Sequence, residues 1–395
     1  MGDPKQRTVL RGTARRDVIV SNGVPQIDAG GGNDVICVTG RPDRRNLATV
    51  RAGDGKDVVD ASAASNGAII YPGRGADRVI GSRYADTVLG GDSPDGASDR
   101  ISTGAGDDLV STPTTPAPAS ERIRLGAGRD VAQLSRLARG TWVDGGSGYN
   151  SLLASSGAAG RVVWDNRSGR LRVDSATLAS WRGFTRFALA APSADSLTFR
   201  GSERKEALRL DGPNRRATMG GGDDVVEETN PSTSSSGFAR LVGGAGRDTF
   251  EFAKAAAVEA DLSAGVFAYA PTLSDSNFAF PMLDFESLDI WSDSAVLVGT
   301  DGRNNITALG CTVQIDGAGG DDRLAVTNKA SPDATRFACP EFTESSTLAG
   351  GAGDDTLVGY RGTDALYGGP GRDSADGGAD VDTCRAERRL NCETS

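Results

Sequence analysis

The sequence predicts an all-β fold in which one short structural unit is stacked many times, a β-solenoid. Four consecutive nine-residue units begin at Gly350 and read GGAGDDTLV, GYRGTDALY, GGPGRDSAD and GGADVDTCR. A period of this length with fixed chemistry at several positions is the signature of a repeat architecture. The composition agrees, because 54 of the 395 residues are Gly and only 6% are aromatic, which suits a thin aliphatic interior better than a large globular core.

The four units share one distribution of residue types. Gly or a small residue usually occupies positions 1, 2 and 4, Asp occupies position 6, and position 8 is usually apolar. Glycines permit positive φ and close backbone approach, so the first six residues can form a tight turn with inward carbonyl groups. Positions 7 to 9 then form a short strand with an inward central side chain, and two units make one coil. The position-6 residues are Asp355, Asp364, Asp373 and Asp382.

Carbonyl and carboxylate oxygens are the ligands that calcium prefers, at six to eight per ion. The pattern G-G-x-G-x-D-x-U-x resembles the calcium-binding nonapeptide of the repeats-in-toxin family, also called hemolysin-type repeats. The resemblance implies a right-handed parallel β-roll or β-solenoid, with calcium held between equivalent turns of successive coils. It also implies that Asp355 pairs with Asp373. Asp364 is expected to pair with Asp382 in the same way. The glycines assigned to these turns are Gly351, Gly353, Gly362, Gly369, Gly371 and Gly378.

Degenerate copies of the unit occur through most of the chain, and their acids are predicted calcium ligands as well. These acids are Asp34, Asp57, Asp77, Asp86, Asp99, Asp108, Asp130, Asp224, Asp248 and Asp322. Their spacings divide the N-terminal acids between two edges of the solenoid. Steps of 17, 23, 20 and 22 residues, each about one coil, connect Asp17, Asp34, Asp57, Asp77 and Asp99. Steps of 22, 22 and 20 residues connect Asp86, Asp108, Asp130 and Asn150 on the other edge.

Three turns depart from the pattern and are expected to bind calcium weakly or not at all. In the turn of Asp17, Arg15 stands at a glycine position. In the turn of Glu206, Arg204 stands at a glycine position. In a third turn Asn304 replaces the acid with a neutral amide.

The periodicity divides the chain into five segments. N-terminal β-roll repeats occupy 1–153, central repeats occupy 201–252, and C-terminal repeats with a disulfide-capped end occupy 299–395. Two irregular β-rich interruptions, 154–200 and 253–298, lack the glycine signature and carry most of the Trp and Phe. We expect these aromatic side chains to fill a wider core; the alternative is a ligand-binding face.

Charge and composition exclude several function classes. The net charge of −10 disfavours nucleic acid as a partner and fits carboxylates directed at cations. The chain contains no His, which removes HExxH zinc chemistry and the Ser-His-Asp triad. No apolar run reaches the length of a membrane span. The strong preference for Arg over Lys is typical of a GC-rich bacterial genome.

The cysteines indicate an oxidising, extracellular environment. Cys384 and Cys392 bracket a polar C-terminal segment, and Cys311 and Cys339 lie on either side of a long loop. Both spacings suit disulfides, and no zinc-type C-x-x-C pair is present. Cys37 is left over.

The predicted function is that of a secreted or surface-attached, calcium-binding structural protein, a monomeric rod without catalytic activity. Its predicted partners are calcium ions and, beyond them, extracellular polysaccharide or cell-surface components. The alternative is a calcium-dependent carbohydrate-active enzyme of the lyase or epimerase kind, or its accessory binding module, because paired carboxylates on parallel β-architectures can act on polysaccharides. Clustered Asp, Arg and Tyr in a cleft would favour that alternative.

Overall fold

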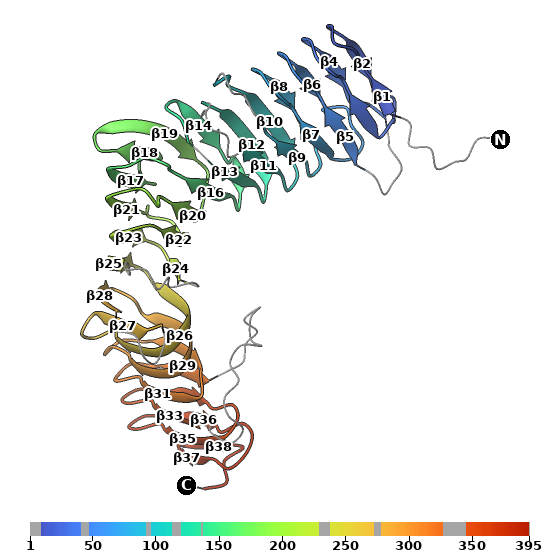
Figure 1. The fold of residues 1–395 in the computed structure, drawn as a ribbon. Helices are drawn as coiled ribbons and strands as arrows, with labels where there is room; N and C mark the ends of the chain where they lie inside the picture. The colour runs from blue at the N-terminus through green and yellow to red at the C-terminus, as the bar shows by residue number, and fades with distance from the viewer. Residues whose placement is uncertain are drawn as a thin grey trace, which may run out of the picture. The chain divides into compact units, whose positions relative to one another are not determined.

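The computed structural model describes residues 9–40, 47–91, 96–112, 120–135, 137–228, 238–271, 278–326 and 345–394. These residues form strands and no α-helix, and successive coils pair through parallel strands (Figure 1). The predicted all-β solenoid is therefore confirmed. No helix among the described residues has the length and apolar character that a bilayer crossing requires.

The chain divides into two compact units. Unit 1 comprises Met1–Thr198 with Leu210–Gly212, and unit 2 comprises Phe199–Arg209 with Pro213–Ser395. In unit 1, alternate strands belong to two parallel stacks, sheet A and sheet B, because each coil contributes one strand to each stack. Residues one coil apart in sequence are therefore register partners, as Ile36 and Val59 are.

The strands of the two stacks in unit 1 are as follows. Sheet A contains β1 (Val9–Arg11), β3 (Gln26–Asp28), β5 (Ala48–Arg51), β7 (Ala68–Tyr71), β9 (Thr87–Leu89), β11 (Leu109–Thr112), β13 (Val131–Leu134), β16 (Ser151–Ser155) and β20 (Arg186–Ala190). Sheet B contains β2 (Val18–Val20), β4 (Val35–Cys37), β6 (Val58–Asp60), β8 (Arg78–Ile80), β10 (Arg100–Ala105), β12 (Arg122–Gly128), β14 (Thr141–Asp144), β15 (Ser147–Gly148) and β19 (Ala176–Arg182).

The first irregular interruption is an antiparallel meander. β17 (Arg161–Asp165) pairs with β18 (Arg170–Val173), and β18 pairs with β19. β21 (Ser196–Arg200) follows later in the chain. Trp164 and Trp181 are both buried, with ring centroids 5.4 Å apart. The aromatic side chains thus fill the wider core of this segment.

Unit 2 also stacks its strands in two columns. One column contains β23 (Arg215–Gly221), β25 (Phe238–Ala245) and β28 (Phe278–Leu283). The other contains β22 (Ala207–Asp211), β24 (Val225–Glu228), β26 (Thr249–Asp261) and β29 (Ser287–Val298). β29 is long enough to pair with both columns of the C-terminal repeats. One of these columns contains β30 (Asn305–Leu309), β32 (Arg323–Val326), β34 (Thr356–Val358), β36 (Ser374–Asp376) and β38 (Arg388–Leu390). The other contains β31 (Thr312–Asp316), β33 (Ser345–Ala349), β35 (Thr363–Tyr367) and β37 (Thr383–Arg385).

The second interruption packs a cluster of phenylalanines. β27 (Val266–Ala270) runs antiparallel to β26 and β28. The ring of Phe250 lies 4.9 Å from that of Phe267 and 6.1 Å from that of Phe280, both edge-on, and all three rings are buried. The expectation that aromatic side chains fill the core is therefore confirmed in both interruptions, and these rings are not available as a ligand face.

The regular coils have a thin aliphatic interior. Most short strands bury their central residue and direct its two neighbours outward, as the alternation of side chains along a strand requires. Ile36, Val59 and Val79 follow one another on consecutive coils of sheet B and are at most 1% exposed. Burying each such side chain contributes about 1.5–3 kcal/mol, which explains why position 8 of the repeat is apolar.

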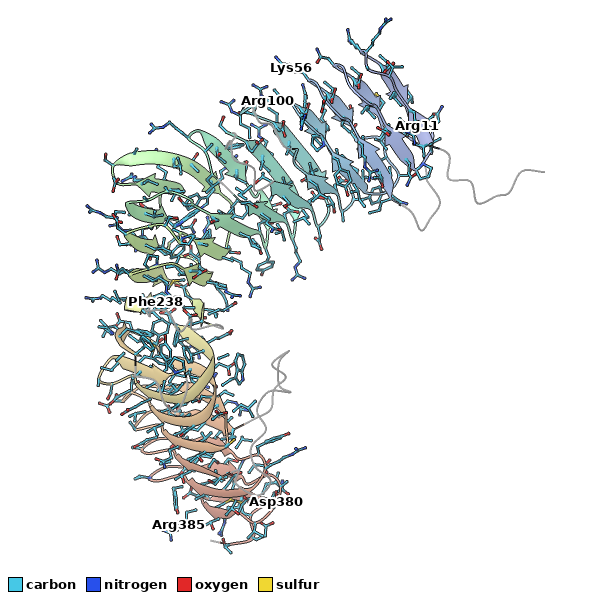
Figure 2. The ribbon with its side chains drawn as sticks, viewed as in Figure 1. Arg11, Lys56, Arg100, Phe238, Asp380 and Arg385 are labelled. Atoms are coloured by element: carbon cyan, nitrogen blue, oxygen red, sulfur yellow. A yellow bond between two sulfur atoms is a disulfide. The ribbon has the colours of Figure 1, made fainter. Side chains whose placement is uncertain are left out.

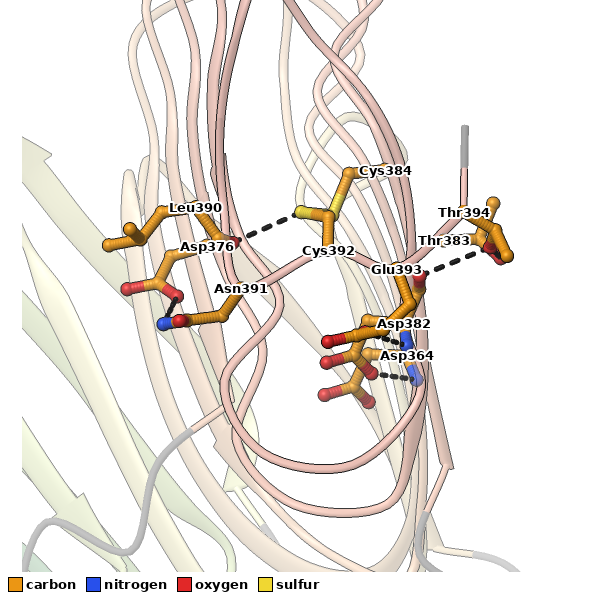
Figure 3. Close-up of a disulfide and its surroundings, with 10 residues drawn as sticks. All are labelled: Asp364, Asp376, Asp382, Thr383, Cys384, Leu390, Asn391, Cys392, Glu393 and Thr394. Atoms are coloured by element: carbon orange, nitrogen blue, oxygen red, sulfur yellow. Dashed lines mark hydrogen bonds between the residues drawn. A yellow bond between two sulfur atoms is a disulfide. The ribbon is translucent and has the colours of Figure 1, made fainter.

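The cysteines are only partly paired as expected. The predicted disulfide between Cys384 and Cys392 is present, with Cα atoms 5.8 Å apart, at the C-terminal end of the stack (Figure 3). Cys311 is disulfide-bonded, and Cys339, its predicted partner, lies outside the described residues. Cys37 is a free, half-buried thiol on β4.

Glycine at position 4 of a turn is required where turns stack closely. Gly353 has a φ of +142°, and a Cβ added to it would lie 2.1 Å from the carbonyl oxygen of Gly320 in the neighbouring turn. Gly302 occupies the same position in another turn but has no positive φ, and its added Cβ would find only Thr300 Oγ1, at 3.6 Å.

These two glycines make a matched pair for mutation. We predict that Gly353→Ala lowers the free energy of unfolding by about 1–3 kcal/mol, because the new methyl group meets a backbone carbonyl and the φ is unfavourable. Gly302→Ala should change it by less than about 0.5 kcal/mol. Urea unfolding followed by circular dichroism, in calcium-containing buffer, measures both. Equal effects would contradict the stacking argument.

Candidate metal centres in the stacked turns

The position-6 acids form continuous rows, and each row is held by one repeated hydrogen bond. The backbone N–H of each acid donates to a carboxylate oxygen of the equivalent acid one coil further on. In the first row of unit 1 this bond joins Asp17 to Asp34, Asp34 to Asp57, Asp57 to Asp77, Asp77 to Asp99 and Asp99 to Glu121, at 2.7–2.9 Å. The second row joins Ala68 to Asp86, Asp86 to Asp108, Asp108 to Asp130 and Asp130 to Asn150, at 2.6–3.0 Å. The two predicted edges are therefore present.

Unit 2 has the same arrangement. One run joins Glu206 to Asp224, Asp224 to Asp248 and Asp248 to Glu286, at 2.6–2.8 Å. A second joins Asn304 to Asp322, Asp322 to Asp355, Asp355 to Asp373 and Asp373 to Glu387, at 2.7–3.0 Å. A third joins Ser346 to Asp364, Asp364 to Asp382 and Asp382 to Glu393, at 2.8–3.0 Å (Figure 3). Asp355 with Asp373, and Asp364 with Asp382, are the pairs expected from the repeat.

Four glutamates complete these rows and were not predicted from the sequence. Each of them is the last acceptor of its row: Glu121 and Glu286 after Asp99 and Asp248, and Glu387 and Glu393 at the C-terminus. Glu121 lies 22 residues after Asp99 and directly before a strand, so a search for any acid at one-coil spacing finds it. The two terminal glutamates lie only 14 and 11 residues after their partners, and no repeat signal marks them.

Many carboxylates in the rows leave one oxygen unsatisfied. Within the described residues, the Oδ2 atoms of the following acids are buried and have no hydrogen-bond partner: Asp34, Asp57, Asp77, Asp108, Asp130, Asp224, Asp248, Asp322, Asp355, Asp373 and Asp382. A buried anionic oxygen without a partner is costly. Turns of this kind are called open turns below. Their unsatisfied oxygens need either a cation or a proton.

Where position 1 of an open turn is Gly, the lack of a side chain lets the unsatisfied oxygen lie close to a carbonyl oxygen of the next coil. A Cβ added to Gly350 would lie 2.3 Å from Asp355 Oδ2 and 2.7 Å from the carbonyl oxygen of Gly368 in the next coil. At Gly317 the corresponding distances are 2.3 Å to Asp322 Oδ2 and 2.5 Å to the Gly350 carbonyl. The unsatisfied carboxylate oxygen and a backbone carbonyl oxygen of the next coil thus lie on the same side of the turn, and calcium accepts such a mixture of oxygen ligands. The residues present therefore fit calcium.

Backbone carbonyls must supply much of any coordination shell in these turns. No cluster of three or more His, Cys, Asp and Glu side chains suited to a metal ion occurs in the described part of the chain. Each open turn contributes one position-6 carboxylate, and several also carry a second acid, such as Asp321 beside Asp322 and Asp354 beside Asp355. A hard cation that prefers oxygen is therefore favoured over zinc, which prefers nitrogen and sulfur ligands.

Asn150 shows what the turn does without an acid. Its Nδ2 group donates to the carbonyl oxygens of Gly145, in its own turn, and Gly183, in the next coil, at 2.8 and 2.9 Å. Two carbonyl oxygens thus converge on the end of the position-6 side chain. Where this side chain is Asp, the equivalent atom is a carboxylate oxygen without a proton to donate. A cation then takes the role that the amide hydrogens have at Asn150.

Burial raises the pKa of these carboxyl groups. Desolvation is the main cause, and neighbouring carboxylates in the row add to it, while the hydrogen bond from the preceding acid opposes it. The pKa is raised to about 7 for Asp77, Asp99, Asp108, Glu121, Asp224 and Asp322, and to about 6 for Asp248. It is also raised, for the same reason, at Asp57, Asp86, Asp130, Asp355, Asp364, Asp373 and Asp382.

A second class of turn satisfies its own carboxylate, and we call these closed turns. Position 2 is then Thr, Ser or Tyr without positive φ, and its backbone N–H donates to an oxygen of the position-6 side chain. Thr13 donates to Asp17, Ser82 to Asp86, Tyr360 to Asp364, Ser202 to Glu206 and Thr300 to Asn304, at 2.6–3.1 Å. Closed turns therefore need no cation to satisfy the acid.

The closed turns contain two of the acids that were predicted to bind calcium and all three position-6 residues that were expected to bind it weakly or not at all. Asp17, Glu206 and Asn304, which were expected to bind weakly or not at all, all lie in closed turns. Asp86 and Asp364 were predicted as ligands, yet their second oxygens accept backbone hydrogen bonds. The reason is the backbone at position 2, where φ is not positive and the N–H is directed inward; Ala318, with a φ of +70°, leaves the turn of Asp322 open. The turn before Asp99 lies partly outside the described residues.

Comparison with known families agrees with this geometry. The family pattern described as the RTX calcium-binding nonapeptide repeat, in four copies, matches residues 71–110 and 349–384. A comparison with curated proteins finds no match. The matched segments contain open turns of both units, including those of Asp77, Asp108, Asp355 and Asp373. The chain thus contains segments similar to RTX calcium-binding nonapeptide repeats, one in each unit.

Proposed function

We propose that this protein is a secreted or cell-surface structural protein whose solenoid is stabilised by calcium in its open turns. The observation that carries the proposal is the row of buried carboxylate oxygens without partners, which in the turns of Asp322 and Asp355 lie close to a carbonyl oxygen of the next coil. Bound calcium would satisfy these oxygens and remove the repulsion between successive acids. Stability would then follow the calcium concentration of the surroundings.

The residues that would hold calcium come in pairs from adjacent coils. Asp355 and Asp373 are the clearest pair, because both turns are open and the acids are joined directly by a hydrogen bond of 3.0 Å. The carbonyl groups of Gly350 and Gly368 lie in the same stacked turns. When bound, calcium supplies the positive charge that the acids lack. The chain supplies fixed oxygens, because the stacked backbone holds them in place.

Disulfide bonding supports a location outside the cell. Cys384 is joined to Cys392, and Cys311 is also disulfide-bonded. Disulfides persist in oxidising compartments and are rare in the cytosol. Extracellular fluids also contain far more free calcium than the cytosol, so the open turns would be filled after export.

A structural role is favoured over catalysis. The acids of the open turns occupy the same structural position in coil after coil, which is the pattern of a repeated support and not of a single reaction centre. Most aromatic side chains of the two interruptions, where the enzyme alternative would place its site, are buried, and Phe278 and Trp291 are half-buried. The absence of His from the sequence removes the commonest general base.

We predict that calcium raises the thermal stability of the protein. A ligand that binds only the folded state stabilises it by RT ln(1 + [L]/Kd) per site, about 2.7 kcal/mol at one hundred times Kd. The melting temperature should therefore rise with calcium concentration and fall when a chelator is added, with loss of β signal in far-ultraviolet circular dichroism. Magnesium at equal concentration is the control, because it demands shorter bonds and octahedral geometry. A melting temperature that does not change with calcium concentration would contradict the proposal.

We predict that an open turn loses calcium on mutation and a closed turn does not. Asp373→Asn keeps an oxygen for the N–H of Asp355 and places an amide where Asn150 has one. It should cost at least one bound calcium while preserving the fold. Asp17→Asn, in a closed turn, should cost none. Isothermal titration counts bound calcium in both variants. Equal losses, or a larger loss for Asp17→Asn, would show that the two classes of turn do not differ in metal binding.

We predict that the calcium-free protein is most stable in acid. The folded pKa of several row acids is raised to about 7, above an unfolded value near 4, so their folded state retains protons that the unfolded state releases. This stabilisation is complete below about pH 4 and is lost as pH rises to about 7. Urea unfolding in chelator should give a lower free energy of unfolding at pH 8 than at pH 5. A flat or opposite dependence between these values would contradict the burial of unpaired acids.

A further inference from the structure

Three arginines lie in register on the outer face of sheet B. Arg78 on β8 is the partner of Arg100 on β10, which is the partner of Arg122 on β12. Trp142 on β14 continues the row. In each of the three strands the Arg is exposed and the following residue is buried, so the guanidinium groups project from the solenoid, as Figure 2 shows for Arg100. Adjacent strands are about 4.8 Å apart, which brings the three cations close together.

The acids that precede these arginines do not neutralise them. Asp77, Asp99 and Glu121 directly precede the arginines in sequence, but Asp77 and Asp99 are buried and all three are bonded along the inner row. Within the described residues, none of the three arginines has an ion pair or a side-chain hydrogen bond. Like charges directly opposite on neighbouring strands are destabilising. The row is therefore an arrangement that an anion would stabilise.

Sheet A shows the usual solution for a charged row. There Arg11, Asp28, Arg51 and Tyr71 follow one another in register on β1, β3, β5 and β7. Arg11 and Asp28 form an ion pair at 3.3 Å, and the guanidinium of Arg51 lies 5.0 Å from the ring centre of Tyr71. The sheet A row contains its own counter-charge. The sheet B row does not, although the whole chain carries an excess of ten negative charges.

The arginine row lines a hollow with the features of a ligand site. The hollow has a volume of about 650 Å³ and is lined by Arg78, Arg100, Ser102, Arg122, Arg124 and Trp142, among others. The guanidinium of Arg124 lies 5.4 Å from the centre of the Trp142 ring, and that of Arg182 lies 5.8 Å from it. Arg182 is already bonded to Asp144, at 2.6 Å. Cations, a hydroxyl group and an indole ring are thus presented together on one surface.

We propose that this hollow binds a carboxylated polysaccharide, which crosses the strands along the arginine row. Arg binds carboxylates through two parallel hydrogen bonds, and a chain of uronic acids presents one carboxylate per ring, so successive rings can meet successive arginines. Ser102 and the Trp142 ring provide partners for sugar hydroxyls and for the apolar face of a ring. Nucleic acid is disfavoured, because its binding domains are basic overall and this protein has a sequence pI of about 4.8. The proposal is independent of calcium in the open turns.

Binding of short uronic acid oligomers tests the proposal. Tetragalacturonate is the probe, because short oligomers avoid the calcium gels of the polymer, and binding is measured by isothermal titration at fixed calcium. The wild-type protein should bind it more tightly than galacturonic acid, and maltotetraose should not bind. The variant Arg78→Gln/Arg100→Gln/Arg122→Gln should weaken binding at least about tenfold, since three ion pairs are lost.

A matched variant controls for net charge. Arg161→Gln/Arg170→Gln/Arg323→Gln removes three exposed arginines that are scattered over other strands, and it should change the affinity less than about twofold. Both variants are checked for the wild-type dichroism spectrum and calcium count, so a failure of the calcium proposal is seen separately. If the triple variant does not fold, Arg100→Gln alone should still weaken binding measurably.

Three results would overturn the proposal. They are no binding of tetragalacturonate by the wild-type protein, equal weakening in both triple variants, and equal affinity for the monomer and the tetramer. Tighter binding of a short oligothymidylate than of tetragalacturonate would assign the row to nucleic acid instead.

Discussion

The constraint on which this structure depends is the burial of rows of carboxylates, one in each turn. Stacking gives each acid after the first of its row a backbone hydrogen bond to one oxygen, for example from Asp355 to Asp373, but this bond uses only half of the carboxylate. The other oxygen is enclosed by backbone, and its partners must come from outside the chain or from the turn itself. Without either, the folded state must protonate these acids, which is why burial raises their pKa.

The two classes of turn differ in how the second carboxylate oxygen can be satisfied. In an open turn the residue at position 2, which is Gly except at Ala318, has a positive φ, and the second oxygen of the acid is left without a backbone donor. In a closed turn a residue such as Thr13 or Ser82 keeps its N–H directed at the acid. One repeat can thus form either a metal-dependent or a metal-independent coil through a change at one position. A solenoid that mixes both would keep part of its structure when calcium is low.

The two faces of each short strand have different functions. The inward side chains make the narrow aliphatic core, so the strands cannot vary there without leaving a cavity. The outward side chains are free to vary, and stacking aligns them into rows along the solenoid. In sheet A of unit 1 the aligned side chains include an ion pair of opposite charges. In sheet B three aligned arginines lie beside Trp142. Binding surfaces on a solenoid arise in this way without disturbing its interior.

The sequence alone determined the all-β class, the two edges of acids, the aliphatic position 8 and the Cys384–Cys392 disulfide, because each follows from local spacing and residue type. Tertiary structure decided which atoms face each acid. That Glu387 and Glu393 end two rows depends on the path of the last coil, and the local spacing of 14 and 11 residues does not reveal it. The engagement of Asp86 by Ser82 depends on backbone angles in the turn, and the arginine row depends on the register between coils. The repeat sequence determines the turn and strand of each nine-residue copy. Contacts between coils depend on how insertions shift one coil against the next.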